Sequence, residues 1–132
     1  MSARYFIIVI SILLFSPSLL AKKTNIIFDA DFMEKNNKLG TITLRDNVNV
    51  IFQQQHLLAD EAVIYEKRTT VVARGNITLS TGRSTLRGEK IEFNYDTNKG
   101  KLYKGVVTSG QVLLESDLIE KVGKEEYVAD NA

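Results

Sequence analysis

The stretch Leu86-Arg87-Gly88-Glu89-Lys90-Ile91-Glu92-Phe93 indicates the fold class, because its pattern occurs four times along the chain. An apolar residue is followed by two variable residues, an acid, one residue, an apolar residue, one residue and usually an aromatic. The copies begin at Phe28, Leu58, Leu86 and Leu114, which are 30, 28 and 28 residues apart. Self-similarity at a nearly fixed period is typical of repeat architectures.

Each repeat alternates apolar and polar residues, as in 48–52, 77–79 and 91–95. A period of two residues predicts strands with one apolar face. Polar spacers such as 66–68 and 96–100 indicate turns between the strands. The half-repeat Arg74-Gly75-Asn76-Ile77 contains residues that tolerate positive φ, which predicts a bulge or tight bend. The sequence therefore predicts an all-β protein of repeated antiparallel hairpins.

Stacked hairpins of this length favour two facing sheets with apolar inner walls. On the register of the four repeats, we expect Val63, Tyr65, Ile91 and Phe93 to share one inner wall. Ile64, Glu92 and Asn94 are then expected to face outward, because neighbouring side chains on a strand point to opposite faces. The pattern alone leaves open whether side chains fill the middle or leave an elongated slot.

The amino-acid composition limits the classes of function that the chain can have. The 132 residues comprise 44% hydrophobic and 25% charged residues, with 17 basic against 16 acidic side chains, which is typical of one globular domain. This balance provides no basic footprint for nucleic acid. The absence of Cys and the presence of one His argue against thiolate metal sites and most activated nucleophiles. We expect no enzyme activity, no cofactor and no metal.

The first 21 residues have the layout of a secretory signal peptide, because Arg4 is their only charge and an apolar run follows it. Cleavage is expected after Ala21 or, alternatively, after Ser18. An uncleaved anchor is the less favoured alternative, since the uncharged stretch lies at the lower limit of about 17–25 residues for a membrane span. The expected mature domain is 22–132.

The segments 58–65, 73–79 and 86–93 resemble the OstA-like repeat of lipopolysaccharide transport proteins. That repeat occurs in LptA, in LptC and in the N-terminal periplasmic domain of LptD, and the resemblance covers roughly 26–132. The ending 118–132 is most similar to the segment that leads from the LptD periplasmic domain towards its barrel. We therefore expect either an isolated LptD-type domain or a truncated reading frame.

The resemblance implies a twisted, partly open β-jellyroll whose apolar groove holds the acyl chains of lipopolysaccharide. It also implies a bridge role in the periplasm, associated with the outer membrane of a Gram-negative bacterium. The implied partners are lipopolysaccharide, other OstA-like proteins joined through exposed edge strands, and an outer-membrane barrel. The groove residues expected on this basis are Val48, Val50, Val63, Tyr65, Ile77, Leu79, Ile91, Phe93, Leu102 and Val107.

Two other classes of function remain open. The repeated acids Asp31, Glu61, Glu89 and Asp117 would suit a parallel β-helix carbohydrate enzyme if two of them faced one sugar-binding cleft. Their recurrence in every unit favours solvated or turn-bonding acids instead, because an active site is usually formed once. A structural β-repeat module of a surface protein, with a filled core and no lipid affinity, is the third alternative.

Overall fold

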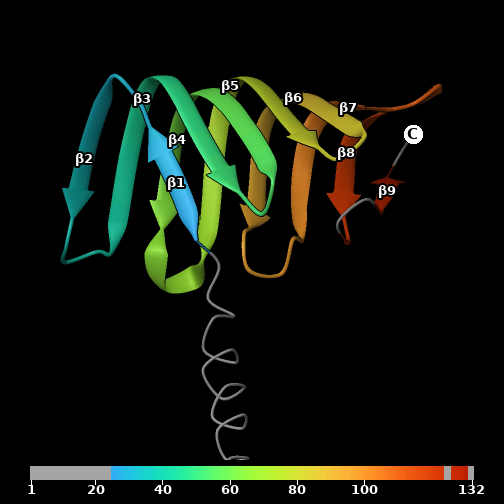
Figure 1. Ribbon diagram of the computed structural model, residues 1–132. Helices are drawn as coiled ribbons and strands as arrows, with labels where there is room; N and C mark the ends of the chain where they lie inside the picture. The colour runs from blue at the N-terminus through green and yellow to red at the C-terminus, as the bar shows by residue number, and fades with distance from the viewer. Residues whose placement is uncertain (1–24, 124–125, 131–132) are drawn as a thin grey trace, which may run out of the picture.

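The computed structural model describes residues 25–123 and 126–130 (Figure 1). The expected signal peptide, 1–21, lies outside these residues. Within the described part of the chain, no helix is long and apolar enough to cross a membrane. The one helical segment that is assigned there is the 3-10 turn η1, Glu66–Arg68.

One antiparallel sheet contains all the assigned strands of the described residues. The strands are β1 (Ile26–Asp29), β2 (Phe32–Asn36), β3 (Thr41–Phe52), β4 (Gln55–Tyr65), β5 (Thr70–Thr81), β6 (Ser84–Asn94), β7 (Gly100–Ser109), β8 (Val112–Lys121) and β9 (Tyr127–Asp130). They pair in the order β1-β3-β4-β5-β6-β7-β8-β9, with β2 also on β3. The prediction of an all-β protein of antiparallel hairpins is confirmed. A parallel β-helix is excluded for this region, because every assigned pair is antiparallel.

Bulges near the middle of the long strands fold this sheet over on itself. The register shifts between Arg45 and Val48 and again between Arg74 and Ile77, and Asn76 at the second shift has a φ of 45°. Such bulges bend strands and increase their twist. Figure 1 shows the strands bending along the upper edge, where the chain passes from one layer to the other. The predicted bulge at Gly75–Asn76 is confirmed.

The bend defines two layers, which we call layer A and layer B. Layer A comprises 32–36, 41–45, 61–65, 70–74, 90–94, 100–103, 118–121 and 127–130. Layer B comprises 26–29, 48–52, 55–59, 77–81, 84–88, 105–109 and 112–116. We call the edge opposite the bend the mouth, because the hairpin turns of both layers end there.

The hydrophobic core lies between the two layers. Val50 and Leu79 from layer B are buried with Ile64 and Ile91 from layer A in one cluster. The rings of Phe52 (layer B) and Phe93 (layer A) stack with centroids 4.7 Å apart and an interplanar angle of 15°. Fully burying each such side chain contributes about 1.5–3 kcal/mol, so this interior stabilises the fold.

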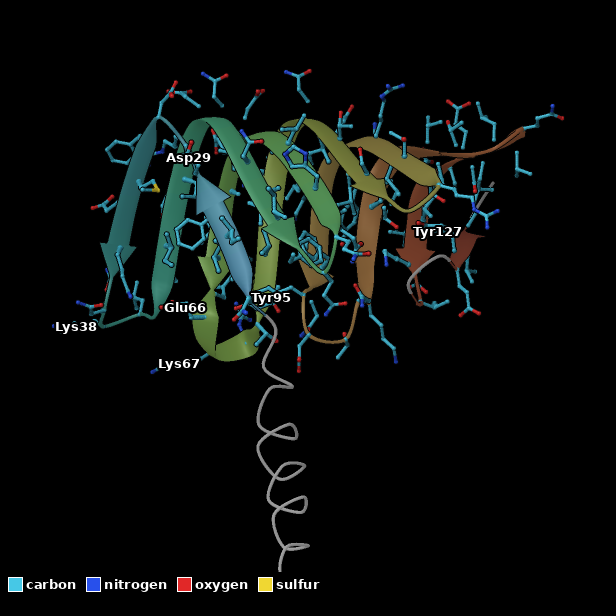
Figure 2. All side chains as sticks on the ribbon, in the orientation of Figure 1. Asp29, Lys38, Glu66, Lys67, Tyr95 and Tyr127 are labelled. Carbon is cyan, nitrogen blue, oxygen red and sulfur yellow. The ribbon has the colours of Figure 1, made fainter. Side chains whose placement is uncertain are left out.

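The turns of layer A follow the polar spacers of the sequence. The segment 66–68 forms η1, and the segment 95–97 forms the turn between β6 and β7. The amide of Tyr95 donates to the carbonyl of Thr69 at 2.9 Å, which ties these two turns together. Figure 2 shows Lys38, Glu66, Lys67 and Tyr95 along the lower edge, which is the layer A side of the mouth. Both turn predictions are confirmed.

Among residues 25–123 and 126–130, the ends of the folded sheet present unpaired strand edges. At one end, β2 is exposed along its whole length, and Ile27 of β1 is 66% exposed. At the other end, β9 pairs only with 118–121 of β8. The layer B half of β8 therefore has a free edge, next to the exposed side chains of Val112 and Leu113.

Candidate lipid-binding slot

Most of the predicted groove residues line the space between the layers, which we call the slot. Eight of the ten are buried on the inner face, namely Val48, Val50, Ile77, Leu79, Ile91, Phe93, Leu102 and Val107. The register aligns them in rows across the strands, since Leu79 pairs with Leu86 and Leu86 pairs with Val107. Sequence alternation therefore identified much of this wall.

Val63 and Tyr65 lie on the opposite, outer face, so their placement on the inner wall was wrong. Val63 pairs with Val72, which pairs with the outward-facing Glu92. Ile64, which was expected to face outward, is buried in the same row as Phe93. The physical reason is that this copy was aligned one residue too late across the bulge between Leu58 and Glu61, and a slip of one residue turns each following side chain to the opposite face.

Side-chain hydrogen bonds show the correct register of the second repeat. Asn47 donates to Asp31 at 2.7 Å, and Asn76 donates to Asp60 at 2.9 Å, with the same separation of 16 residues in both pairs. The acid equivalent to Asp31 is therefore Asp60, not Glu61. Shifting this copy to begin at Leu57 makes the repeats start 29, 29 and 28 residues apart. That more regular spacing was the signal that could have identified the correct register.

The sequence reasoning missed several inner residues, and the shifted register explains those of β4. In β4 these are Leu57, Ala62 and Ile64, and elsewhere they include Leu44, Val71, Leu86 and Ile119, all of which are buried. Leu57 and Leu86 occupy equivalent positions in their repeats, and both are fully buried. These residues complete an aliphatic lining on both walls.

Side chains fill the slot near the mouth. A cleft lined by Phe52, Gln55, Leu79, Phe93, Asn98 and Lys121 has no room for a water molecule. A ligand inside the slot would therefore have to separate the layers or displace these side chains.

The inner surface changes from apolar to polar at the mouth. On the layer B side, Gln55 pairs with Thr81 and Thr81 pairs with Ser84 in one row, and all three are buried. On the layer A side, Lys121 is buried and donates to the carbonyls of Asn98 at 3.1 Å and Gly123 at 2.7 Å. The mouth is thus closed by polar groups, whereas the interior is aliphatic.

The outer face of layer A is polar. In its central row, Glu92 pairs with Lys101 and Lys101 pairs with Glu120, so that opposite charges lie side by side. The guanidinium of Arg68 lies 4.5 Å from the ring centroid of Tyr65, and the ammonium of Lys90 lies 5.2 Å from that of Tyr103. These cations cover the outer aromatic rings, so the outer face differs chemically from the inner one.

An open pocket of about 350 Å³ lies where the mouth ends of β6, β7 and β8 meet. Its walls include Phe93 and Val122, with Lys101 and Glu120 beside them. A Cβ on Gly100 would come within 2.4 Å of the Glu92 carbonyl oxygen, so glycine is required there for the close approach of β6 and β7. The mixed charges around the pocket select neither anions nor cations.

The repeated acids do not converge on a cleft. Glu61, Glu89 and Asp117 are exposed, and Asp31 bonds the Asn47 amide at the bend. Among the described residues, no group of three or more His, Asp or Glu side chains is arranged to hold a metal ion. The imidazole Nε2 of His56 lies 2.6 Å from the Asn49 side-chain oxygen on the exposed outer face of layer B. The favoured interpretation, solvated or turn-bonding acids, agrees with these positions.

Comparison with known proteins identifies the same fold in a transport component. No protein-family model matches the chain, and no curated protein matches it in sequence. Among solved structures, it is similar to LptH from Pseudomonas aeruginosa, described as the LptA-homologous periplasmic component of the lipopolysaccharide transport device. The TM-score is 0.74 at 18% sequence identity, over 82% of this chain and 83% of that chain. This likeness shows a shared β-jellyroll fold.

Proposed function

We propose that this protein is an OstA-like periplasmic component of lipopolysaccharide transport that holds acyl chains in the slot between its layers. The observation that carries the proposal is the pair of aliphatic inner walls on a fold shared with LptH. The apolar segment 1–21 supports export to the periplasm. Association with the outer membrane, and an LptD-type rather than LptA-type role, are finer parts of the same proposal.

The chemistry of the walls supports an acyl ligand over a sugar ligand. The buried rows are almost wholly Val, Leu, Ile, Ala and Phe. Each methylene that moves from water into such surroundings contributes about 0.8 kcal/mol. Sugars and phosphates would stay outside, where the solvent and the charged outer surface can solvate them.

The free edges support a bridge assembled end to end. Within the described part of the chain, the exposed β2 at one end and the uncovered half of β8 at the other each offer unpaired backbone groups. Exposed strand edges are templates for pairing with another chain. We propose other OstA-like proteins as the partners at these edges.

Photo-crosslinking from matched aromatic positions tests the proposal. The photoreactive amino acid p-benzoylphenylalanine replaces Phe93 on the inner face or, as the control, Tyr65 on the outer face. Both substitutions exchange one aromatic side chain for another in layer A, two strands apart. With purified lipopolysaccharide, we expect an adduct from position 93 and none from position 65.

Equal capture from both positions would contradict the proposal, because the lipid would then adhere to the outside of the sheet. Absence of capture by a folded Phe93 variant would favour the second candidate function, a structural β-repeat module. The packed interior near Phe52 and Phe93 is the observation that favours that candidate.

A further inference from the structure

We infer that hydrogen bonds between two hairpin turns form a latch that holds the slot shut until a ligand enters. The latch consists of the side chains of Gln53, Gln55 and Asn98 and the carbonyl of Tyr95. Gln53 and Gln55 belong to the layer B side of the mouth, whereas Tyr95 and Asn98 belong to the β6–β7 turn of layer A. Opening the mouth requires these contacts to break.

Three hydrogen bonds cross the mouth at one place. The Gln53 side-chain amide donates to the Tyr95 carbonyl at 3.0 Å, and the Asn98 amide donates to the Gln53 side-chain oxygen at 2.6 Å. The Gln55 amide donates to the Asn98 side-chain oxygen at 2.6 Å. Asn98 therefore bonds both glutamines at once, and it is the central residue of the latch.

The closed latch carries a free-energy penalty. Gln53 and Gln54 have φ values of 44° and 64°, which a two-residue turn normally reserves for Asn, Asp or Gly. The Oε1 atom of Gln55 is buried without a hydrogen-bond partner. The left-handed turn is common to the closed and open states, so its strain favours neither. The unsatisfied acceptor penalises the closed state, because water can reach it when the mouth opens. The closed mouth is therefore poised to open.

The latch lies where it can control access to the slot between the layers. Directly beneath it lie the stacked rings of Phe52 and Phe93 and the cleft that is too narrow for water. At the opposite edge the layers are joined by continuous strands through the bulges, so they can separate only at the mouth. Acyl chains that enter through this part of the mouth would have to pass the latch first.

Cysteine labelling of the ligand-free protein tests the latch, since the chain has no native Cys. A Ser84→Cys variant places a thiol on the buried mouth row, and Ala73→Cys places one on the inner face nearer the bend. In the Ser84→Cys background, Asn98→Gly removes two latch bonds while retaining a residue that tolerates the φ of 66°. The expected result is maleimide labelling of the thiol at position 84 faster by on the order of 10-fold or more.

A matched control uses the same substitution far from the mouth. Asn76 also has positive φ and one side-chain bond, to Asp60 at the bend, so Asn76→Gly should leave labelling at position 84 unchanged. Gln53→Gly, which also relieves a left-handed residue, provides a second latch variant and should accelerate labelling as Asn98→Gly does. Unchanged labelling in both latch variants would overturn the latch. Equal acceleration of labelling at position 73, in the Ala73→Cys background, would overturn it too, because it would report global unfolding.

The identity of the ligand rests on the proposed function, and a separate arm tests it. With p-benzoylphenylalanine at position 93, Asn98→Gly should increase the rate of lipopolysaccharide capture. If labelling responds as expected but lipopolysaccharide is never captured in any variant, the latch stands and the proposed function fails. If capture occurs at an unchanged rate in Asn98→Gly, lipid does not enter through this part of the mouth, and the inference is wrong.

Discussion

Replacement of two adjacent residues tests the register of β4, on which the inner wall of the slot depends. Ile64 is 1% exposed in the row of Phe93, whereas Val63 is only partly buried on the outer face. Ile64→Ala should lower the free energy of unfolding by about 2–5 kcal/mol, through lost burial and a cavity. Val63→Ala should cost less than about 1 kcal/mol, because it creates no buried cavity.

Urea unfolding followed by far-ultraviolet circular dichroism measures both values on the same protein. At a slope of about 1–3 kcal/mol per molar, the Ile64→Ala midpoint should fall by roughly 1 M or more, and the Val63→Ala midpoint should move much less. Equal losses, or a larger loss for Val63→Ala, would refute the reasoning. Val63 would then face the core, as the four-repeat pattern first suggested.

Three further outcomes follow from other parts of the fold. In thermal melts, Gly75→Ala should lower the stability by roughly 1–2 kcal/mol more than Gly110→Ala. Both glycines have positive φ, but a Cβ at position 75 would come within 2.6 Å of Asp60 Oδ2, whereas a Cβ at position 110 would meet no atom. Equal losses of stability in the two variants would contradict this. Burial, together with the nearby carboxylates of Glu66 and Asp96, raises the pKa of the Tyr95 hydroxyl above 10.0. The unfolded chain therefore loses the hydroxyl proton at a lower pH than the folded protein, and the free energy of unfolding should fall as the pH rises above about 10. Titration at 295 nm should show a late ionisation that Tyr95→Phe removes, and no change in that variant would contradict the assignment. Val112→Lys with Leu113→Lys should weaken end-to-end association in sedimentation velocity, because lysines on an exposed strand edge oppose pairing; an unchanged sedimentation profile would exclude this edge.

The sequence predicted the fold because the two-residue alternation is unbroken within each half of the long strands, on either side of the bend. In β6, Ile91 and Phe93 face the core as expected, because this copy of the repeat was aligned in the correct register. In β4 the same reasoning failed at Asp60 and Glu61. Both residues are acidic and both are exposed, so composition could not show which of them occupies the bulge.

The latch could not be predicted from the sequence, because it depends on how the two layers cross. Gln53 and Asn98 are 45 residues apart and belong to different hairpins. Their hydrogen bonds place the β3–β4 turn of layer B against the β6–β7 turn of layer A. Lone polar residues in turns are ordinary in sequence, and only the fold shows that these face each other.

The distance across the mouth is the measurement that tests the account most directly. Spin labels on Gln54→Cys and Thr97→Cys, both exposed and on opposite sides of the mouth, report this distance by pulsed electron paramagnetic resonance. We expect one short distance in the lipid-free protein and a longer one when purified lipopolysaccharide is added. Bound lipopolysaccharide with an unchanged distance, or no binding at all, would contradict a slot that opens at its mouth to hold acyl chains.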